Sequence, residues 1–158
     1  MKQLNLEKIR ATLERVPEEF EGLVAQIGFP SGQHYEDGTS VAFVASVHEF
    51  GAPGVNIPAR PFMRPTVNTK KQTWVNTVKN GIPKVVMGKA TAFDVLDLVG
   101  IQGAADIQET ISKVTSPPLS PITIARKGSA KPLIDTGLMI ASVRHSVAPS
   151  GSEFTDKG

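Results

Sequence analysis

The sequence predicts one α+β domain, in which several helices pack on a small antiparallel sheet and a long proline-rich loop joins two of them. Three observations lead to this fold class. A chain of 158 residues suits a single domain. Apolar residues recur at helical spacing in several segments, whereas only 22–29 and 142–147 have the pattern of strands. Four prolines in residues 52–65 exclude a regular helix or a central strand there.

In the first half, Asn5 can cap an amphipathic helix that Pro17 should end. The strand at 22–29 follows. Residues 41–50 are nearly all apolar, so periodicity alone does not separate strand from helix. A Thr-Ser pair before this run and Gly51 after it favour a short buried helix.

Two longer helices are expected in the second half. Thr66 can cap the first of them, which Asn80-Gly81 and a following proline should interrupt. Thr91 opens the next. Gly100 and Gly103 lie inside it at a cost of about 1 kcal/mol each relative to alanine, so close packing on a neighbour should compensate.

The end of the chain should complete the sheet. A short helix at 138–141 precedes the strand at 142–147, which we expect to pair with the strand at 22–29. The single domain then spans residues 1–148, and residues 149–158 are expected to form a flexible tail.

Composition argues against several functional classes. The chain contains no cysteine, which removes disulfides, thiol catalysis and thiolate zinc sites and fits a protein made in a reducing cytoplasm. No apolar run reaches the roughly 18 to 20 residues that span a bilayer, and the N-terminus lacks the apolar core of a secretion signal. We therefore expect no membrane partner.

No catalytic residue, metal ligand or cofactor is predicted. The pair His48-Glu49 would need a second histidine four residues after the first to resemble a zinc protease, and position 52 is alanine. A small hydrolase built around His48, Glu49 and His145 is the alternative from the enzyme class, and we expect the protein not to be an enzyme.

Charge is unevenly distributed along the chain. Every charged residue between positions 59 and 90 is basic, and the segments on both sides are acidic. This pattern suggests docking between subunits or contact with a polyanion, although a solvated helix face would look the same. The candidates for facing DNA are Lys70, Lys71, Lys79, Lys84 and Lys89.

Two clusters stand out as candidate interaction residues. Prolines stiffen residues 57–65, so the arginine and aromatic side chains there lose little entropy on binding. The predicted interface residues are Phe50, Ile57, Arg60, Phe62, Met63 and Arg64. The alternative is intramolecular, with Phe62 in the core and Arg60 paired to Asp135 or Glu49. The predicted loop-pinning or capping residues are Glu49, Asp135 and Thr136.

These clusters carry a resemblance to a known group of proteins. The chain contains His-Glu-Phe-Gly at 48–51, Ile-Pro-Ala-Arg-Pro-Phe-Met-Arg-Pro at 57–65, Pro-Pro-Leu-Ser-Pro-Ile-Thr-Ile-Ala-Arg-Lys-Gly at 117–128 and Pro-Leu-Ile-Asp-Thr-Gly-Leu-Met at 132–139. In this order they resemble the virion-morphogenesis and minor tail component families of tailed bacteriophages, over about residues 38 to 147.

The resemblance implies a structural virion protein without enzymatic activity, a neck, tail-completion or tail-terminator subunit. It implies a homo-oligomeric ring of hexameric symmetry at the head–tail junction, which joins the tail tube to the head connector. Connector and tail-tube proteins would be its neighbours, and genomic DNA would pass through its lumen. The alternative function is a basic DNA-contacting protein that lines a channel or a packaging assembly.

Overall fold

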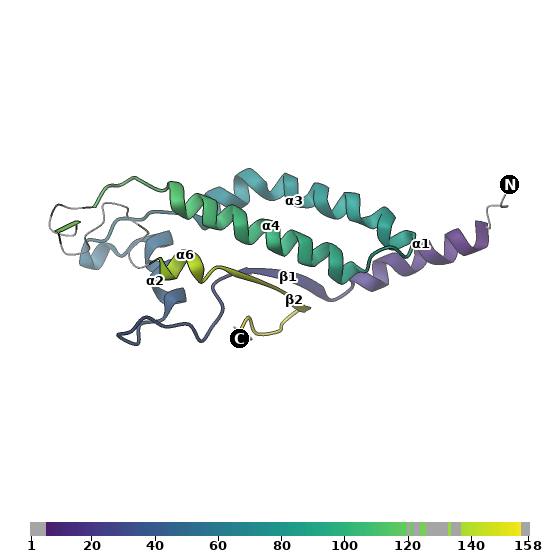
Figure 1. The fold of residues 1–158 in the computed structure, drawn as a ribbon, viewed down its shortest axis with the longest axis horizontal. Coiled ribbons are helices and arrows are strands. Elements are labelled where there is room, and N and C mark those ends of the chain that lie inside the picture. Colours follow the sequence, from purple (N-terminus) through teal and green to yellow (C-terminus); the bar gives the residue numbers. More distant parts are fainter. Residues whose placement is uncertain (1–5, 120, 122–123, 126–132, 134–136, 156–158) are drawn as a thin grey trace.

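The computed structural model of the chain describes residues 6–119, 121, 124–125, 133 and 137–155. Within them it confirms the α+β class, with five α-helices and a two-stranded antiparallel sheet. The molecule is elongated (Figure 1), with α1 (Leu6–Phe20) at one end and α2 (Val41–Phe50) at the other. Two long helices, α3 (Met63–Val86) and α4 (Ala92–Lys113), run side by side along its length.

The sheet pairs β1 (Leu23–Gly28) with β2 (Arg144–Pro149), so the predicted pairing of the early and late strands is confirmed. Helix α4 lies on one face of this sheet, and its two interior glycines make the contact. A Cβ atom on Gly100 would lie 2.4 Å from Cδ2 of His145, and one on Gly103 would lie 2.4 Å from Cδ1 of Ile27. The glycines therefore allow the close packing that the sequence predicted.

Helix α3 differs from the prediction at both ends. It begins at Met63, so Thr66 lies inside it and does not cap it. The Thr66 hydroxyl instead donates to the Phe62 carbonyl at 2.6 Å and lies 2.6 Å from the Thr110 hydroxyl of α4. The helix also continues through Gly81, because a Cβ there would lie 2.6 Å from Val95 and the glycine lets α3 approach α4 closely. Pro83 lies in the last turn, where its nitrogen cannot donate to the carbonyl of Lys79, and the helix nevertheless continues to Val86.

Helix α1 also runs past a proline that was expected to end it. Pro17 lies inside α1, which continues to Phe20. The final turn is held because Val16 and Phe20 pack with Val85 and Val95 in a small apolar cluster at this end of the molecule. Burial of apolar surface therefore outweighs the lost backbone hydrogen bond.

The starts of α2 and α4 match the expectation more closely. The Ser40 hydroxyl caps α2 by accepting the Phe43 N–H, and Gly51 ends the helix at a φ of 75°. The threonine cap of α4 is confirmed as well, because Thr91 and Asp94 form a reciprocal capping box. After a short 3₁₀ helix, η1 (Pro53–Val55), the chain reaches α3, so the proline-rich loop is shorter than predicted.

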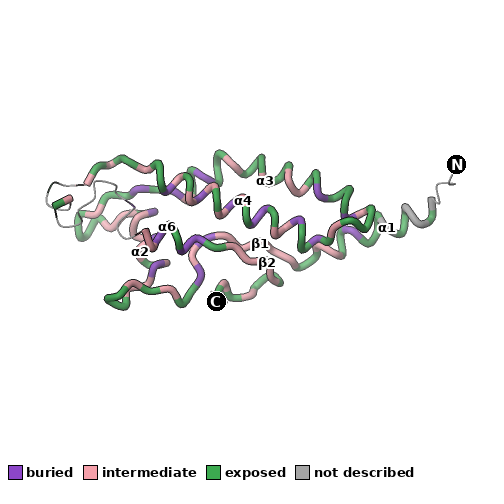
Figure 2. The backbone as a smooth tube through the Cα atoms, in the orientation of Figure 1, coloured by how far each residue is buried: buried purple, intermediate pink, exposed green. Residues whose placement is uncertain are grey.

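The main core lies between α2, the sheet and α4. Its buried residues are Val41, Ala45, Phe62, Ile107, Ile111, Leu133, Met139 and Val143. In Figure 2 the buried segments of the backbone lie where these layers meet, and the outer surface of α3 is largely exposed. The short helix α6 (Leu138–Ala141) covers one side of this core.

The last described residues, within the segment expected as a flexible tail, form hydrogen bonds with β1 and the residues after it. The Gln26 side chain donates to the Ser152 carbonyl at 2.8 Å, and the Ser31 N–H donates to the Phe154 carbonyl at 2.9 Å. Ser31 also forms a parallel bridge with Thr155. This segment therefore folds back beside β1 through backbone and side-chain hydrogen bonds.

Candidate functional site

The most exposed apolar side chains of the described chain lie at the α2 end of the molecule. Phe43 and Phe50 are 62% and 65% exposed, and Val55 in η1 is 70% exposed. The two phenylalanines are seven residues apart and therefore share one side of α2, opposite the buried Val41 and Ala45. We call Phe43, Phe50 and Val55 the tip face. Large aromatic side chains with this exposure are the usual anchors of protein interfaces.

A buried carboxylate holds this end of the molecule in place. Glu49 is 4% exposed, and its Oε2 accepts the backbone N–H groups of Phe62 at 2.7 Å and Met63 at 2.9 Å. Its Oε1 accepts the Arg64 backbone N–H at 3.1 Å. These are N–H groups at the start of α3 that have no partner within the helix, so Glu49 of α2 caps α3 from outside.

Glu49 is also held in its charged form. Burial alone would raise the pKa of its carboxyl, but a hydrogen bond from the Arg64 side chain and three from backbone N–H groups more than offset that effect. The pKa of Glu49 therefore lies below its ordinary value. The predicted loop-pinning role fits this geometry, with Arg64 as the partner in place of Arg60.

Arg64 connects this capping contact to the tip face. Its Nε lies 2.9 Å from Oε1 of Glu49, and one terminal nitrogen donates to the Glu49 carbonyl at 3.0 Å. Its guanidinium carbon lies 5.1 Å from the centroid of the Phe50 ring, within cation–π distance. The Arg64 side chain is still 59% exposed, so a positive charge lies beside an exposed aromatic ring.

Two predicted interface residues are not on the surface. Phe62 is fully buried and packs edge-on against Phe29, with ring centroids 5.9 Å apart. Arg60 is 5% exposed and donates to the carbonyls of Pro117 at 2.8 Å and Pro118 at 3.2 Å. Their assignment to a protein interface is wrong, because the stiff loop turns both side chains inward to fill the core and to hold the segment after α4.

Arg60 is buried with backbone carbonyls as its partners among the described residues. Burial lowers its pKa, yet a guanidinium stays protonated at any ordinary pH. Its expected pairing with Glu49 is not formed. Ile57 and Met63 are half-buried, and Met63 packs against the main core, so of the six predicted interface residues only Phe50 and Arg64 are exposed.

Sequence reasoning missed Phe43 and Val55. The run at 41–50 is almost entirely apolar, so it indicated a helix buried all round. The charged residue at 49 shares the spacing of Val41 and Ala45 and was the available signal. A helix whose buried side carries a capping carboxylate has its aromatic residues at 43 and 50 on the opposite, exposed side.

The predicted DNA-facing lysines are divided between two settings. Lys70 lies 2.9 Å from Asp106 and 3.7 Å from Glu109, and these carboxylates raise the pKa of its ammonium group. The other four are exposed and form no ion pair within the described part of the chain: Lys71, Lys79, Lys84 and Lys89. Lys84 borders a cavity of about 380 Å³ between α3 and α4, with Asp94 on its other side.

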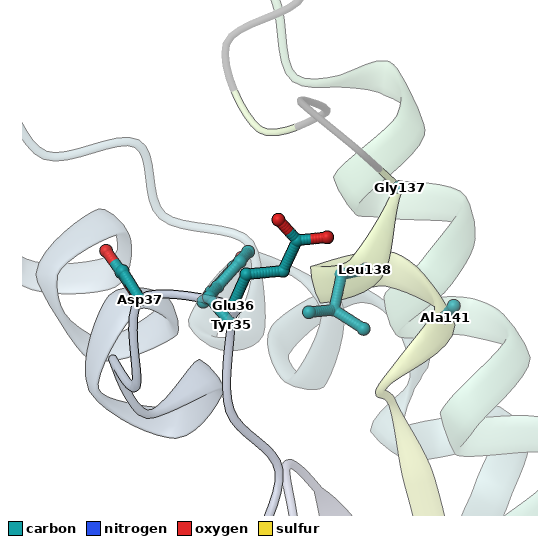
Figure 3. Close-up of a pocket in the computed structure, with 6 residues that line it drawn as sticks. All are labelled: Tyr35, Glu36, Asp37, Gly137, Leu138 and Ala141. Atoms are coloured by element: carbon teal, nitrogen blue, oxygen red, sulfur yellow. The ribbon is translucent and has the colours of Figure 1, made fainter.

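A second, larger cavity of about 660 Å³ lies between the loop before α2 and α6 (Figure 3). Tyr35, Leu138 and Ala141 line it with apolar surface, and Glu36 and Asp37 contribute carboxylates. The Asp37 carboxylate accepts the Thr39 N–H at 2.9 Å, and this hydrogen bond lowers the pKa of Asp37. The cavity therefore has apolar walls and a negatively charged rim.

Asp135 and Thr136 lie outside the described residues, so their predicted capping role is not addressed. His145 Nε2 lies 2.9 Å from Asp97 on the face between β2 and α4. Glu49 is occupied by the start of α3. Glu49 and His145, two residues of the hydrolase alternative, thus bind partners on different elements.

No protein-family model, no curated protein and no solved structure matches the chain. Within the described residues, no group of three or more histidine or acidic side chains is arranged to hold a metal ion. None of the described helices is both long and apolar enough to cross a bilayer.

Proposed function

We propose that this chain is a structural subunit of a tailed bacteriophage, which forms a ring at the head–tail junction and docks on its neighbours through the tip face. The observation that supports the proposal most directly is the pair of phenylalanines on α2, each more than 60% exposed and one beside the Arg64 guanidinium. The sequence resemblance points to the same class of protein.

Rigidity is the physical reason why the tip face suits docking. Helix α2, which carries both phenylalanines of the tip face, is fixed to α3 by four hydrogen bonds to one buried carboxylate. Side chains on a fixed backbone lose less conformational freedom on association than side chains on a mobile loop. Burial of two aromatic rings therefore contributes to affinity with a small entropic loss.

The proposal predicts a separation between folding and assembly. The double substitution Phe43→Ser and Phe50→Ser should leave the fold intact, because neither ring is buried in the monomer. It should abolish head–tail joining, since the apolar anchors of the contact are gone. Electron microscopy of lysates from a phage that carries the variant gene would show separate heads and tails in place of joined particles.

The matched control is Phe93→Ser with Ile101→Ser, which removes two apolar side chains of similar exposure, 49% and 50%, from α4. Joined particles at wild-type yield are expected from this control. Normal joining by the tip-face variant, or absence of the protein from purified particles, would contradict the proposal.

A second candidate function is contact with DNA through the outer side of α3. Lys71 and Lys79 favour it, because both are exposed and eight residues apart, which places them about 80° apart around the helix. The two functions are compatible when this side of α3 faces the lumen of a ring.

A further inference from the structure

Two complementary surfaces of this chain cannot meet within one molecule. The first is a protruding aromatic ring with a cation beside it, Phe50 with Arg64. The second is the cavity of about 660 Å³ beside α6, with apolar walls and the carboxylates of Glu36 and Asp37. They lie at opposite ends of α2, whose ten residues span about 15 Å, so Phe50 does not reach the cavity of its own protomer.

We propose that Phe50 of one copy inserts into the Tyr35–Leu138 cavity of the next copy, with Arg64 against its acidic rim. This contact is heterologous, since each protomer offers a ring on one surface and a cavity on another, and such contacts close into rings or continue as filaments. The biological setting of this contact rests on the proposed function. The contact itself should form between purified copies of the chain.

The size and shape of the cavity support this occupant. The cavity is open to solvent on one side, and its volume of about 660 Å³ leaves space for one aromatic ring and part of an arginine. Figure 3 shows Leu138 and Ala141 of α6 on one wall and Tyr35 on the other. Hydrogen bonds fix the second wall, with Tyr35 and Thr39 joined at 2.9 Å and the Asp37 carboxylate bound to the Thr39 N–H.

The charges of Arg64 and of the cavity rim favour the same contact. Arg64 keeps more than half of its side chain exposed although it binds Glu49. Glu36 and Asp37 are both exposed, and the hydrogen bond that lowers the pKa of Asp37 keeps it ionised at neutral pH. An exposed cation beside an apolar ring fits an apolar cavity with an anionic rim, and the attraction should weaken as salt is added.

The test uses two variants of the full chain. Phe50→Glu removes the ring, and Ala141→Trp fills the cavity from an exposed position on α6. Self-association is followed by sedimentation velocity and by light scattering at low salt. The wild type should assemble with rising concentration, and each variant should associate roughly thirtyfold more weakly, as expected for loss of an interface anchor.

Mixing the two variants gives the decisive result. The Phe50→Glu chain keeps its cavity and the Ala141→Trp chain keeps its ring, so together they retain one working contact. The mixture should form a 1:1 heterodimer that does not grow further. Phe93→Glu, which adds the same charge at an exposed apolar position of α4, should assemble like the wild type.

Other outcomes overturn the contact. A wild-type chain that stays monomeric at all concentrations, an Ala141→Trp variant that assembles normally, or a mixture that gives no heterodimer would each do so. Glu36→Lys serves as a second cavity variant on an exposed residue if Ala141→Trp does not fold. A chain that assembles through this contact but is absent from phage particles would contradict only the proposed function, whereas a monomeric chain found in the particles would contradict only the contact.

Discussion

Glu49 shows how one residue can determine the position of a whole surface. It is a charged group in a buried position, and such groups are stable only when several donors surround them. Here the donors are the N–H groups at the start of α3 and the guanidinium of Arg64. The carboxylate therefore joins α2 to α3, the next α-helix along the chain, and the tip face depends on that connection.

Because the pKa of Glu49 is lowered in the folded state, its contribution to stability depends on pH. The unfolded chain binds the proton more readily, so the contribution is complete above the ordinary value of 4.5 and is lost as the pH falls through the lower pKa of the folded protein. Glu49→Gln should reduce the free energy of unfolding by roughly 2 kcal/mol at neutral pH and by less in acid. Urea titrations of both proteins from pH 3 to about 7 measure this difference.

The comparison for that prediction is Glu109→Gln, an exposed carboxylate paired with Lys113 and Lys70. It should change the free energy of unfolding far less than Glu49→Gln does, since surface ion pairs contribute little. A loss that is equal for Glu49→Gln at every pH would show that the carboxylate is not ionised in the native protein.

At the residue level, the sequence correctly predicted a stiff segment but not the directions in which its side chains point. The prolines around Arg60 and Phe62 correctly indicated a stiff segment with few free conformations. Stiffness does not determine which way a side chain points, because that depends on where α2 and α4 lie. The same segment therefore turns Phe62 into the core and leaves Arg64 outside.

At the scale of elements, local signals predicted the beginnings of helices better than their ends. Caps are made by neighbours in sequence, so Ser40 and Thr91 were recognisable. The proline signals at 17 and 83 were outweighed by packing on distant residues, which no local pattern contains. The start of α3 was missed for the same reason, since its cap comes from Glu49, thirteen residues before Phe62.

The contact between α4 and the sheet gives a prediction about Gly100. Alanine there would gain about 1 kcal/mol of helix propensity, but its Cβ would lie 2.4 Å from Cδ2 and 2.8 Å from Cγ of the His145 ring. The ring and the sheet must move, so Gly100→Ala should destabilise the protein by roughly 1–2 kcal/mol overall. Denaturant unfolding checks this value, and Asn76→Ala on the exposed side of α3 should be neutral or slightly stabilising.

Across the whole molecule, the two apolar clusters and the basic residues are arranged along the long axis. The larger cluster supports the α2 end, and the smaller one, with Val16, Val85 and Val95, joins α1 to the far ends of α3 and α4. The exposed Lys71, Lys79 and Lys84 lie along α3, yet they do not form one stripe. Lys84 is five residues from Lys79 and hence about 140° away around the helix.

This arrangement limits how many phosphates one molecule can contact. If duplex DNA binds the outer side of α3, Lys71→Gln with Lys79→Gln should reduce the slope of log affinity against log salt by about 2 in magnitude, since each phosphate contact contributes roughly 0.9. Lys84→Gln, on the side facing Asp94, should leave the slope unchanged. Fluorescence anisotropy with a labelled duplex gives the slopes, and lack of binding at low salt would remove DNA contact as a function.

The separation between the buried carboxylate of α2 and its exposed rings has an evolutionary consequence. Phe43 and Val55 take no part in the hydrogen bonds that fix α2 to α3, so substitutions at these positions need not lower fold stability. Relatives that diverge from this chain can then change binding partners through substitutions at these two positions. Glu49 and Phe62 are constrained by folding instead, because any substitution there changes the stability of the native structure.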